Sequence, residues 1–155
     1  MILSGSFTFN GPRTTVWDLL QDPAVLAKAL PGTKTLTKTA ADSYQGVMKV
    51  SVGPVTAAEF AVNVELKDKR PPEKFSMLID GKGGVGFTKG TATIELEERP
   101  GPLTVMNYTS DVQVGGKIAA VGQRLLESVG KMMTKKALDA LDNELRVRLG
   151  KQHPR

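Results

Sequence analysis

The order of two hydrophobic patterns constrains the fold of this chain more than any other feature. Between residues 43 and 114, apolar and polar residues alternate in successive segments that Gly and Pro turns separate, as in antiparallel strands with one solvated face. One long helical pattern follows, roughly from Lys117 to Leu149. A sheet with one apolar face needs a cover, and only this helix is long enough to be one. We therefore expect the sheet to curl around the helix.

The first forty residues predict further elements. Ile2 to Phe9 alternates like a strand, and residues 10–32 hold two short apolar stripes that Asp22-Pro23 separates, which predicts two short helices in a row. The sequence thus predicts an α+β fold with a curled antiparallel sheet of about seven strands, two short helices after strand 1 and a long C-terminal helix. It predicts a single domain over residues 1–149 and a basic tail over residues 150–155.

The composition excludes several kinds of chemistry. The chain has no cysteine, so disulfides, thiolate metal sites and Cys nucleophiles are excluded. The only histidine is His153, close to the C-terminus, so we expect neither a Ser-His-Asp triad nor a metal site. A single Tyr or Asp in a cavity could still perform acid–base chemistry. Five carboxylates lie at strand ends or on the polar face of the strands, where solvated sheet charges are normally found: Glu59, Glu65, Asp80, Glu95 and Asp111.

The net charge of +5 lies wholly on the last helix and tail. Residues 1–116 carry 12 basic and 12 acidic side chains, whereas residues 117–155 carry 9 basic and 4 acidic ones. Such a basic helical end can meet an acidic partner or an anionic membrane, or it can be a solvated helix face. Aromatic residues make up only 5% of the chain and the strands do not interleave them with basic residues, so no nucleic-acid partner is expected.

Targeting signals are not evident in the sequence. No apolar run approaches the roughly 18 residues of a membrane span. The N-terminus shows neither the basic leader nor the apolar core of a signal peptide. We therefore expect a cytoplasmic protein.

The segment "GKGGVG", residues 81–86, matches the G-x-G-x-x-G pattern of dinucleotide-binding sites. That site requires a helix after the glycines, because the helix N-terminus holds the pyrophosphate. Here the strand pattern "FTKGTATIELEE" follows. The segment is therefore predicted to be a glycine-rich hairpin.

Two glycines, Gly122 and Gly130, fall inside the predicted long helix, where each should cost about 1 kcal/mol relative to Ala. Many apolar strand residues are small or flexible, and the chain's 6 methionines can form an adaptable lining. The glycines indicate either a cavity between helix and sheet or unusually close packing of the two. A filled core is the alternative to a cavity.

Four segments resemble the G-subunit family of carbon monoxide dehydrogenase, which belongs to the START-like (SRPBCC) helix-grip superfamily: "LPGTKTL", "SYQGVMKVSVGPVTAAEFAVNVEL", "GKGGVGFTKGTATIEL" and "TVMNYTSDVQVGGKIAAVGQRLL". The resemblance covers about residues 1–149. It implies a non-catalytic accessory protein that binds a hydrophobic molecule, such as a quinone or a lipid, between sheet and C-terminal helix. It also implies a role in recruiting a molybdenum hydroxylase to the membrane, and no covalent cofactor.

The resemblance also implies which residues line the cavity. Tyr108 is the best polar group among them, since its hydroxyl can bond a ligand carbonyl or a buried backbone group. The chain has Thr33 where many relatives have Cys, and it lacks the apolar anchor of longer relatives. A transient contact of the basic helix end with the inner face of an anionic membrane is therefore the most that we expect. The full predicted lining is Trp17, Leu20, Met48, Val50, Phe60, Val62, Met77, Met106, Tyr108, Val112, Ile118, Gly122, Leu125 and Val129.

Two other functions remain open from the sequence. One is an enzyme of the cyclase or dehydratase type on the same fold, for which Tyr108 is the only ionisable side chain in the predicted lining. The other is an assembly factor with a filled core and no ligand. Fold alone does not decide among these functions.

Overall fold

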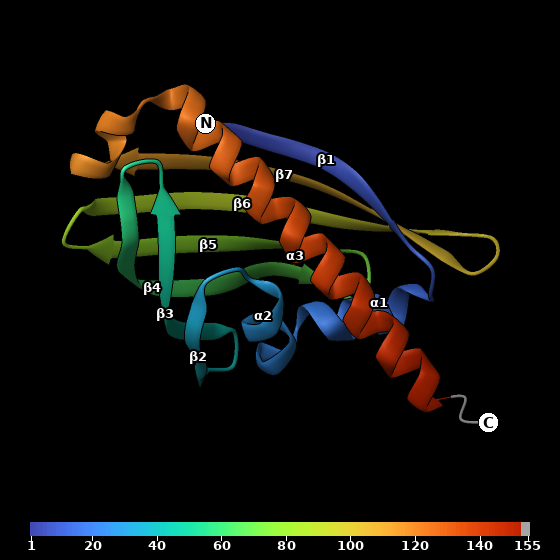
Figure 1. The fold of residues 1–155 in the computed structure, drawn as a ribbon. Helices are drawn as coiled ribbons and strands as arrows, with labels where there is room; N and C mark the ends of the chain where they lie inside the picture. Colours follow the sequence, from blue (N-terminus) through green and yellow to red (C-terminus); the bar gives the residue numbers. More distant parts are fainter. Residues whose placement is uncertain (153–155) are drawn as a thin grey trace.

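The computed structural model describes residues 1–152 and confirms the predicted fold class (Figure 1). Seven antiparallel strands form one sheet in the order β1-β7-β6-β5-β4-β3-β2. Strand β2 lies outside the segments in which the sequence pattern predicts strands. The elements are β1 Ile2–Phe9, α1 Arg13–Leu20, α2 Pro23–Ala29, β2 Thr33–Ala40, β3 Ser43–Val52, β4 Val55–Arg70, β5 Lys74–Gly83, β6 Gly86–Arg99, β7 Leu103–Gly115, the 3-10 helix η1 Lys117–Val121, and α3 Gln123–Gln152.

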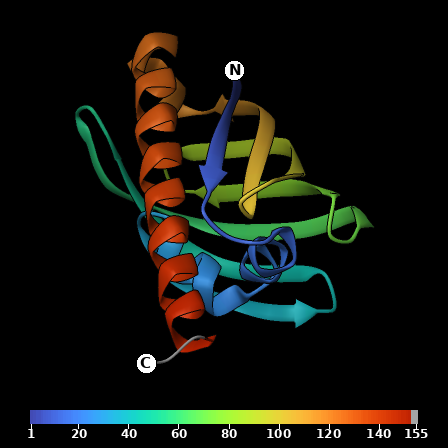
Figure 2. The same cartoon turned by 90° about the vertical axis from the view of Figure 1, so that its right-hand side faces the viewer.

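The sheet curls, and α3 runs diagonally across its concave face (Figures 1 and 2). The two short helices contact both layers: α1 packs on β6, β7 and α3, and α2 packs on β2 and α3. They fill the space between the sheet and the C-terminal half of α3. The apolar parity of the strands predicts this arrangement, since it turns one face of the sheet toward the helices.

The closed core lies at the end of the sheet that α1 and α2 cover. Trp17 of α1 meets Phe75 of β5 edge to face, with ring centroids 5.3 Å apart and an interplanar angle of 87°. Phe75 and Leu145 of α3 are each only 1% exposed. Together with Val25 and Ala29 of α2, these side chains join all three helices to the sheet in one apolar cluster.

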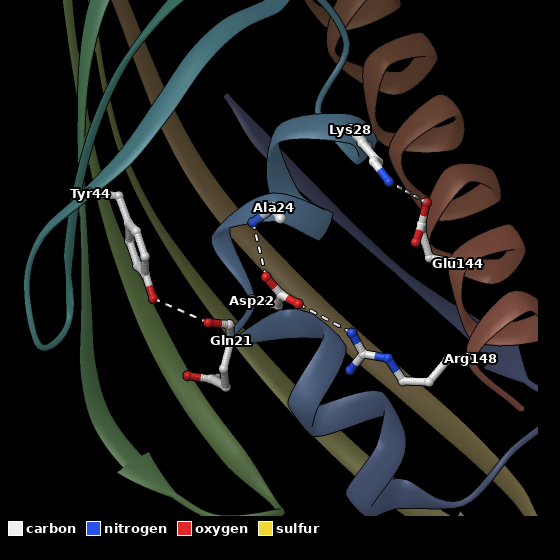
Figure 3. Close-up of polar contacts among 7 residues, drawn as sticks. All are labelled: Gln21, Asp22, Ala24, Lys28, Tyr44, Glu144 and Arg148. Atoms are coloured by element: carbon white, nitrogen blue, oxygen red, sulfur yellow. Dashed lines mark hydrogen bonds and ion pairs between the residues drawn. The ribbon is translucent and has the colours of Figure 1, made fainter. Parts of the chain in front are cut away.

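A polar cluster fixes the turn between α1 and α2 against α3 (Figure 3). Asp22 is the N-cap of α2, and its Oδ1 accepts a hydrogen bond from the Ala24 N–H at 3.0 Å. Its other oxygen, Oδ2, lies 3.2 Å from Nη2 of Arg148 on α3. Lys28 and Glu144 add a second, longer ion pair at 3.8 Å. The Asp22 carboxylate therefore caps the N-terminus of α2 and also ties this turn to α3.

The long helix begins later than the sequence predicts. Residues Lys117–Val121 form the 3-10 helix η1, and α3 begins only at Gln123. Gly122 joins them with a φ of +101°, which glycine adopts without the strain that other residues suffer. Its carbonyl accepts the first helical hydrogen bond from the Leu126 N–H at 3.1 Å. The prediction that Gly122 lies inside the helix is therefore wrong: the glycine is needed for its backbone conformation.

Gly130 does lie inside α3, and close packing explains it. A Cβ on Gly130 would stand 2.9 Å from Cδ1 of Leu3 on β1, which is too close for an undisturbed contact. The helix also continues beyond the predicted end at Leu149 to Gln152. The rest of the predicted basic tail, residues 153–155, lies outside the described residues.

The segment "GKGGVG" forms the predicted hairpin. Strands β5 and β6 pair along their length up to Gly83 and Gly86, which leaves a two-residue turn at Gly84 and Val85. No helix follows the glycines. A pyrophosphate site of the dinucleotide type is thus absent from this segment.

Candidate binding site

The N-terminal half of α3 is supported at two sides of the sheet. On one side Leu3 of β1 packs against Gly130. On the other side Leu125 touches the turn between β3 and β4, where a Cβ on Gly53 would lie only 2.6 Å from its Cδ2. The strands that α3 contacts most are accordingly β1 and β3, and not the central strands β4 to β7. The backbone of α3 therefore approaches the edges of the concave face more closely than its centre.

Small side chains occupy the centre of this face. Gly90 of β6 pairs with Ile79 of β5 and Val112 of β7, and in the next inward-facing row Ala92 pairs with Met77 and Ser110. All six are only partly buried, although they face the helix. A glycine and an alanine in the middle of a sheet leave room above them that longer side chains would fill. This part of the interior is consequently more open than the core around Phe75.

The predicted lining residues fall into two groups in the structure. Six of them are buried, three in the closed core or beside it and three toward the β5–β6 hairpin: Trp17, Leu20 and Met106, and Phe60, Val62 and Ile118. Seven are partly exposed along the concave face or on the N-terminal half of α3: Met48, Val50, Met77, Tyr108, Val112, Leu125 and Val129. Gly122 lies at the start of α3 with open space beside its Cα. That these residues hold a ligand stays a prediction.

The predicted lining omits Gly90 and Ala92. Both share the parity of Ile94 and Leu96, whose side chains are buried. The period-two pattern of "TKGTATIEL" therefore contains the signal that could have found them. Glycine is usually interpreted as a turn residue. Because Gly90 has no apolar side chain, it interrupts the alternating pattern that would mark the position as facing inward.

Tyr108 lies at an opening between β1 and α3. Its ring covers Gly5 of β1, where a Cβ would stand 2.5 Å from the tyrosine hydroxyl oxygen. A hollow of about 800 Å³ on the outer face of the sheet includes none of the predicted lining residues. The same holds for a hollow of about 460 Å³ at the β5–β6 hairpin. Tyr108, by contrast, lines a hollow of about 540 Å³ together with Leu3, Phe7, Lys131 and Leu138. Of these three hollows within residues 1–152, it is the one that a predicted lining residue borders.

The ionisable groups of the strands lie mainly on the outer face. The hollow of about 800 Å³ is on that face, and its walls include Asn63, Asp80, Lys89 and Gln113. Glu59 is exposed there, and its hydrogen bond and charge interaction with Lys34, at 2.9 Å, hold the pKa of the carboxyl below its usual value. Among the described residues, no group of three or more His, Asp or Glu side chains could hold a metal ion. The concave face therefore offers apolar contact and no converging carboxylates.

Comparison with known proteins places the chain in a family. The profile of the carbon monoxide dehydrogenase G-subunit family (CoxG) matches residues 5–146. A conserved protein from Geobacillus kaustophilus is 30% identical, with a TM-score of 0.89 over 94% of this chain and 95% of that one. No curated protein is similar enough to this chain to count as a match.

More distant solved structures share the fold. A START superfamily protein from Mycobacterium smegmatis is 11% identical, with a TM-score of 0.73 over 94% of this chain and 97% of that one. An aromatase/cyclase from Streptomyces sp. R1128 is 15% identical, with a TM-score of 0.71 over 96% and 95% of the two chains. These likenesses confirm the START-like helix-grip fold and show that it carries enzymes as well as other proteins.

Proposed function

Because this chain belongs to the G-subunit family of carbon monoxide dehydrogenase, we propose that it is a non-catalytic binding protein for a hydrophobic molecule of quinone or lipid type. The ligand lies between the sheet and the N-terminal half of α3. The protein serves as an accessory to a carbon monoxide dehydrogenase-type molybdenum hydroxylase. One observation carries the proposal: apolar side chains facing α3 are left partly exposed around Gly90 and Ala92.

The size of the ligand follows from the energetics of such a site. Each buried CH₂ contributes about 0.8 kcal/mol, whereas association costs on the order of 4–15 kcal/mol in lost freedom. An apolar ligand with few polar contacts therefore needs roughly five to twenty buried carbon atoms to offset this cost, and about ten more for micromolar affinity. A prenylated ring or an acyl chain meets this requirement.

The proposal assigns no catalytic residue. A cyclase or dehydratase needs an ionisable group against its substrate. The carboxylates that the strands carry are on the opposite face of the sheet, as Glu65 and Asp80 show by lining the outer hollow. Tyr108 remains the residue to examine if turnover of a bound ligand is ever observed.

The first test is extraction of the purified protein with organic solvent, followed by mass spectrometry, with the native mass of the intact protein measured in parallel. We expect one isoprenoid quinone or lipid per chain, or uptake of added quinone to that ratio. A native mass equal to that of the bare chain, with no uptake of added quinone or lipid, would contradict the proposal. An assembly factor without a ligand would then be the better interpretation.

A peripheral contact with an anionic membrane also belongs to the proposal, but at a different place from the predicted basic helix end. Two cations at that end already have partners: Arg146 lies 2.9 Å from Asp142, and Arg148 lies 3.2 Å from Asp22. In contrast, residues 81–89 and 114–126 contain three lysines, an arginine and no acidic residue. No helix within residues 1–152 is long and apolar enough to cross a membrane.

The hairpin end adds an exposed aromatic ring to this charge. Phe87 is 43% exposed and lines the hollow of about 460 Å³ with Lys82 and Lys117. The Ile118 N–H donates to the Val85 carbonyl at 2.8 Å, which holds the hairpin to η1. An aromatic side chain beside lysines suits the boundary between lipid headgroups and acyl chains. We therefore place the membrane contact at this hairpin.

Substitution of the hairpin residues tests this placement. Lys82→Ala and Lys117→Ala should each weaken flotation with phosphatidylserine-containing vesicles roughly fivefold, since a lysine near an anionic surface contributes about 1 kcal/mol. Phe87→Ser should weaken it further. Val147→Ser is the matched control, because Val147 is 53% exposed on the C-terminal half of α3. Loss of flotation with Val147→Ser, and none with Phe87→Ser, would move the contact back to the helix end.

A further inference from the structure

The carboxamide of Gln21, a partly buried residue, has no hydrogen-bond partner among the described residues. It follows α1 at the turn into α2, and its backbone carbonyl accepts a hydrogen bond from the Tyr44 hydroxyl at 3.3 Å (Figure 3). Both polar atoms of its carboxamide, Oε1 and Nε2, are buried, and neither has a hydrogen-bond partner within the described part of the chain. A buried polar group without a partner costs about 1–3 kcal/mol. An apolar residue would therefore be better here if only stability mattered.

The structural tasks at this turn belong to other groups. Asp22 provides the N-cap of α2 and the ion pair with Arg148. Val16, Leu19 and Leu20 of α1 supply the packing. In Figure 3 the side chain of Gln21 extends toward the sheet, away from Arg148 and α3. Its amide thus takes no part in holding the three helices together.

Gln21 lies on the concave side of the sheet, beside Tyr44 of β3. Tyr44, which bonds it, faces inward from β3 and is 3% exposed. Tyr44 pairs with Val64 of β4, and Val64 pairs with Ile79 of β5. At about 4.8 Å between strands, Ile79 is roughly 10 Å from Tyr44. Ile79 is partly exposed beside Gly90, so a ligand over the open region would extend across Val64 to reach the Gln21 carboxamide.

The charges around Gln21 leave no free cation for an acidic head group. Lys69 is 2.7 Å from Asp42, and Arg148 is paired with Asp22. Arg13 is at the other end of α1, about 12 Å away at 1.5 Å per residue. Burial raises the pKa of the Tyr44 hydroxyl, which therefore stays neutral. A carboxylate placed beside Gln21 would be buried without a counter-ion, which is costly.

We propose that the Gln21 carboxamide recognises the head group of the ligand, and that this head group is uncharged and carries a carbonyl or hydroxyl group. The amide N–H donates to a carbonyl, and the amide oxygen accepts from a hydroxyl. The inference rests on the proposed hydrophobic ligand and adds the group that selects it. It gives the site a second polar group, in addition to the hydroxyl of Tyr108.

A pair of probes that differ only in polar groups tests the proposal. Menadione and 2-methylnaphthalene share one methylated bicyclic skeleton, but only menadione has carbonyls, and naphthalene-2-carboxylate supplies the acidic counterpart. Equilibrium dialysis of the full chain measures the affinity for each. Gln21→Met removes the amide at nearly constant length. Gln45→Met is the matched control, since Gln45 is exposed on the outer face of β3, next to Tyr44.

We expect Gln21→Met to weaken menadione binding about five- to tenfold and to leave 2-methylnaphthalene binding unchanged, because one buried neutral hydrogen bond is lost. Gln45→Met should change neither affinity, and naphthalene-2-carboxylate should bind the unmodified protein least. Equal effects of Gln21→Met on both neutral probes, or no effect on either, would overturn the role of Gln21 alone. Failure of the unmodified protein to bind either neutral probe would overturn the proposed function as well.

Thermal unfolding without ligand separates recognition from a structural role. If the amide serves the ligand, Gln21→Met should unfold at the same temperature as the unmodified protein or at a higher one, because a buried polar group without a partner has been replaced. A clear fall in the unfolding temperature would show that the amide stabilises the fold, and would contradict the proposal. Far-UV circular dichroism of the variant shows whether the folded state is retained.

Discussion

Ala92→Phe is expected to lower binding of a hydrophobic ligand by about tenfold or more, because a phenyl ring would occupy space that a pocket must offer to its ligand. Ala92 is partly exposed at the centre of the concave face, where it pairs with Met77 and Ser110. Ala92 faces α3 and is not closely covered, as its partial exposure shows, so the new ring can project from β6. The folded state should therefore survive. Equilibrium dialysis with menadione and far-UV circular dichroism measure the two effects.

Thr91→Phe is the matched control for this substitution. Thr91 precedes Ala92 on β6 and is exposed on the outer face, where it lines the hollow of about 800 Å³. We expect Thr91→Phe to bind menadione like the unmodified protein. If Ala92→Phe is folded and binds menadione normally, the ligand does not lie over the centre of the sheet. Equal loss in both variants would instead indicate a general effect on the strand.

Gly122 is a poor site for such a test. It has a φ of +101°, so any other residue would strain the backbone between η1 and α3. A substitution there would mix backbone strain with any effect on the ligand. Ala92 has an ordinary strand conformation within β6 and avoids this problem.

Trp17→Ala is expected to lower the free energy of unfolding by about 3–5 kcal/mol, the usual cost of removing a large aromatic side chain from a core. Trp17 is 7% exposed and makes the edge-to-face contact with Phe75 that joins α1 to the sheet. Such a contact adds about 0.5–1.5 kcal/mol to the effect of buried area. Urea unfolding followed by far-UV circular dichroism measures the change, since the chain's only tryptophan is removed.

Val147→Ala controls for the loss of an apolar side chain as such. Val147 is 53% exposed on α3, and surface substitutions usually change stability by less than about 0.5 kcal/mol. A loss below about 1 kcal/mol for Trp17→Ala would mean that the site collapses around the missing ring. It would also mean that the region beneath α1 is less rigid than the burial of Phe75 indicates.

The two predictions concern two parts of one interior that the sequence does not distinguish. Met77 and Phe75 have the same parity on β5, and this parity by itself predicts that both face the helices. In the structure Phe75 is buried beneath α1, whereas Met77 is partly exposed. The difference arises because α1 and α2 cover only one end of the sheet. The alternation of apolar and polar residues along a strand predicts which face of the sheet a residue occupies. It does not predict which element packs against that face.

The sequence by itself determined the kinds of element, their order and the family. Period-two alternation and helical spacing are local properties, and local signals such as Asp22-Pro23 place the start of a helix well. The parity of "TKGTATIEL" likewise contained the inward positions of Gly90 and Ala92. These features survive folding because they depend on neighbours a few residues apart.

Only the tertiary structure decided where α3 begins, why Gly130 is a glycine, which cations of α3 are neutralised and which inward side chains stay partly exposed. Apart from the local backbone of Gly122 and the Arg146–Asp142 pair, these features depend on contacts between residues far apart in the chain. Leu3 meets Gly130, Asp22 meets Arg148, and the β3–β4 turn meets Leu125. Such contacts exist only once the sheet has curled and the helix crosses it, because chain reversal and packing bring together faces whose separation along the sequence carries no local pattern.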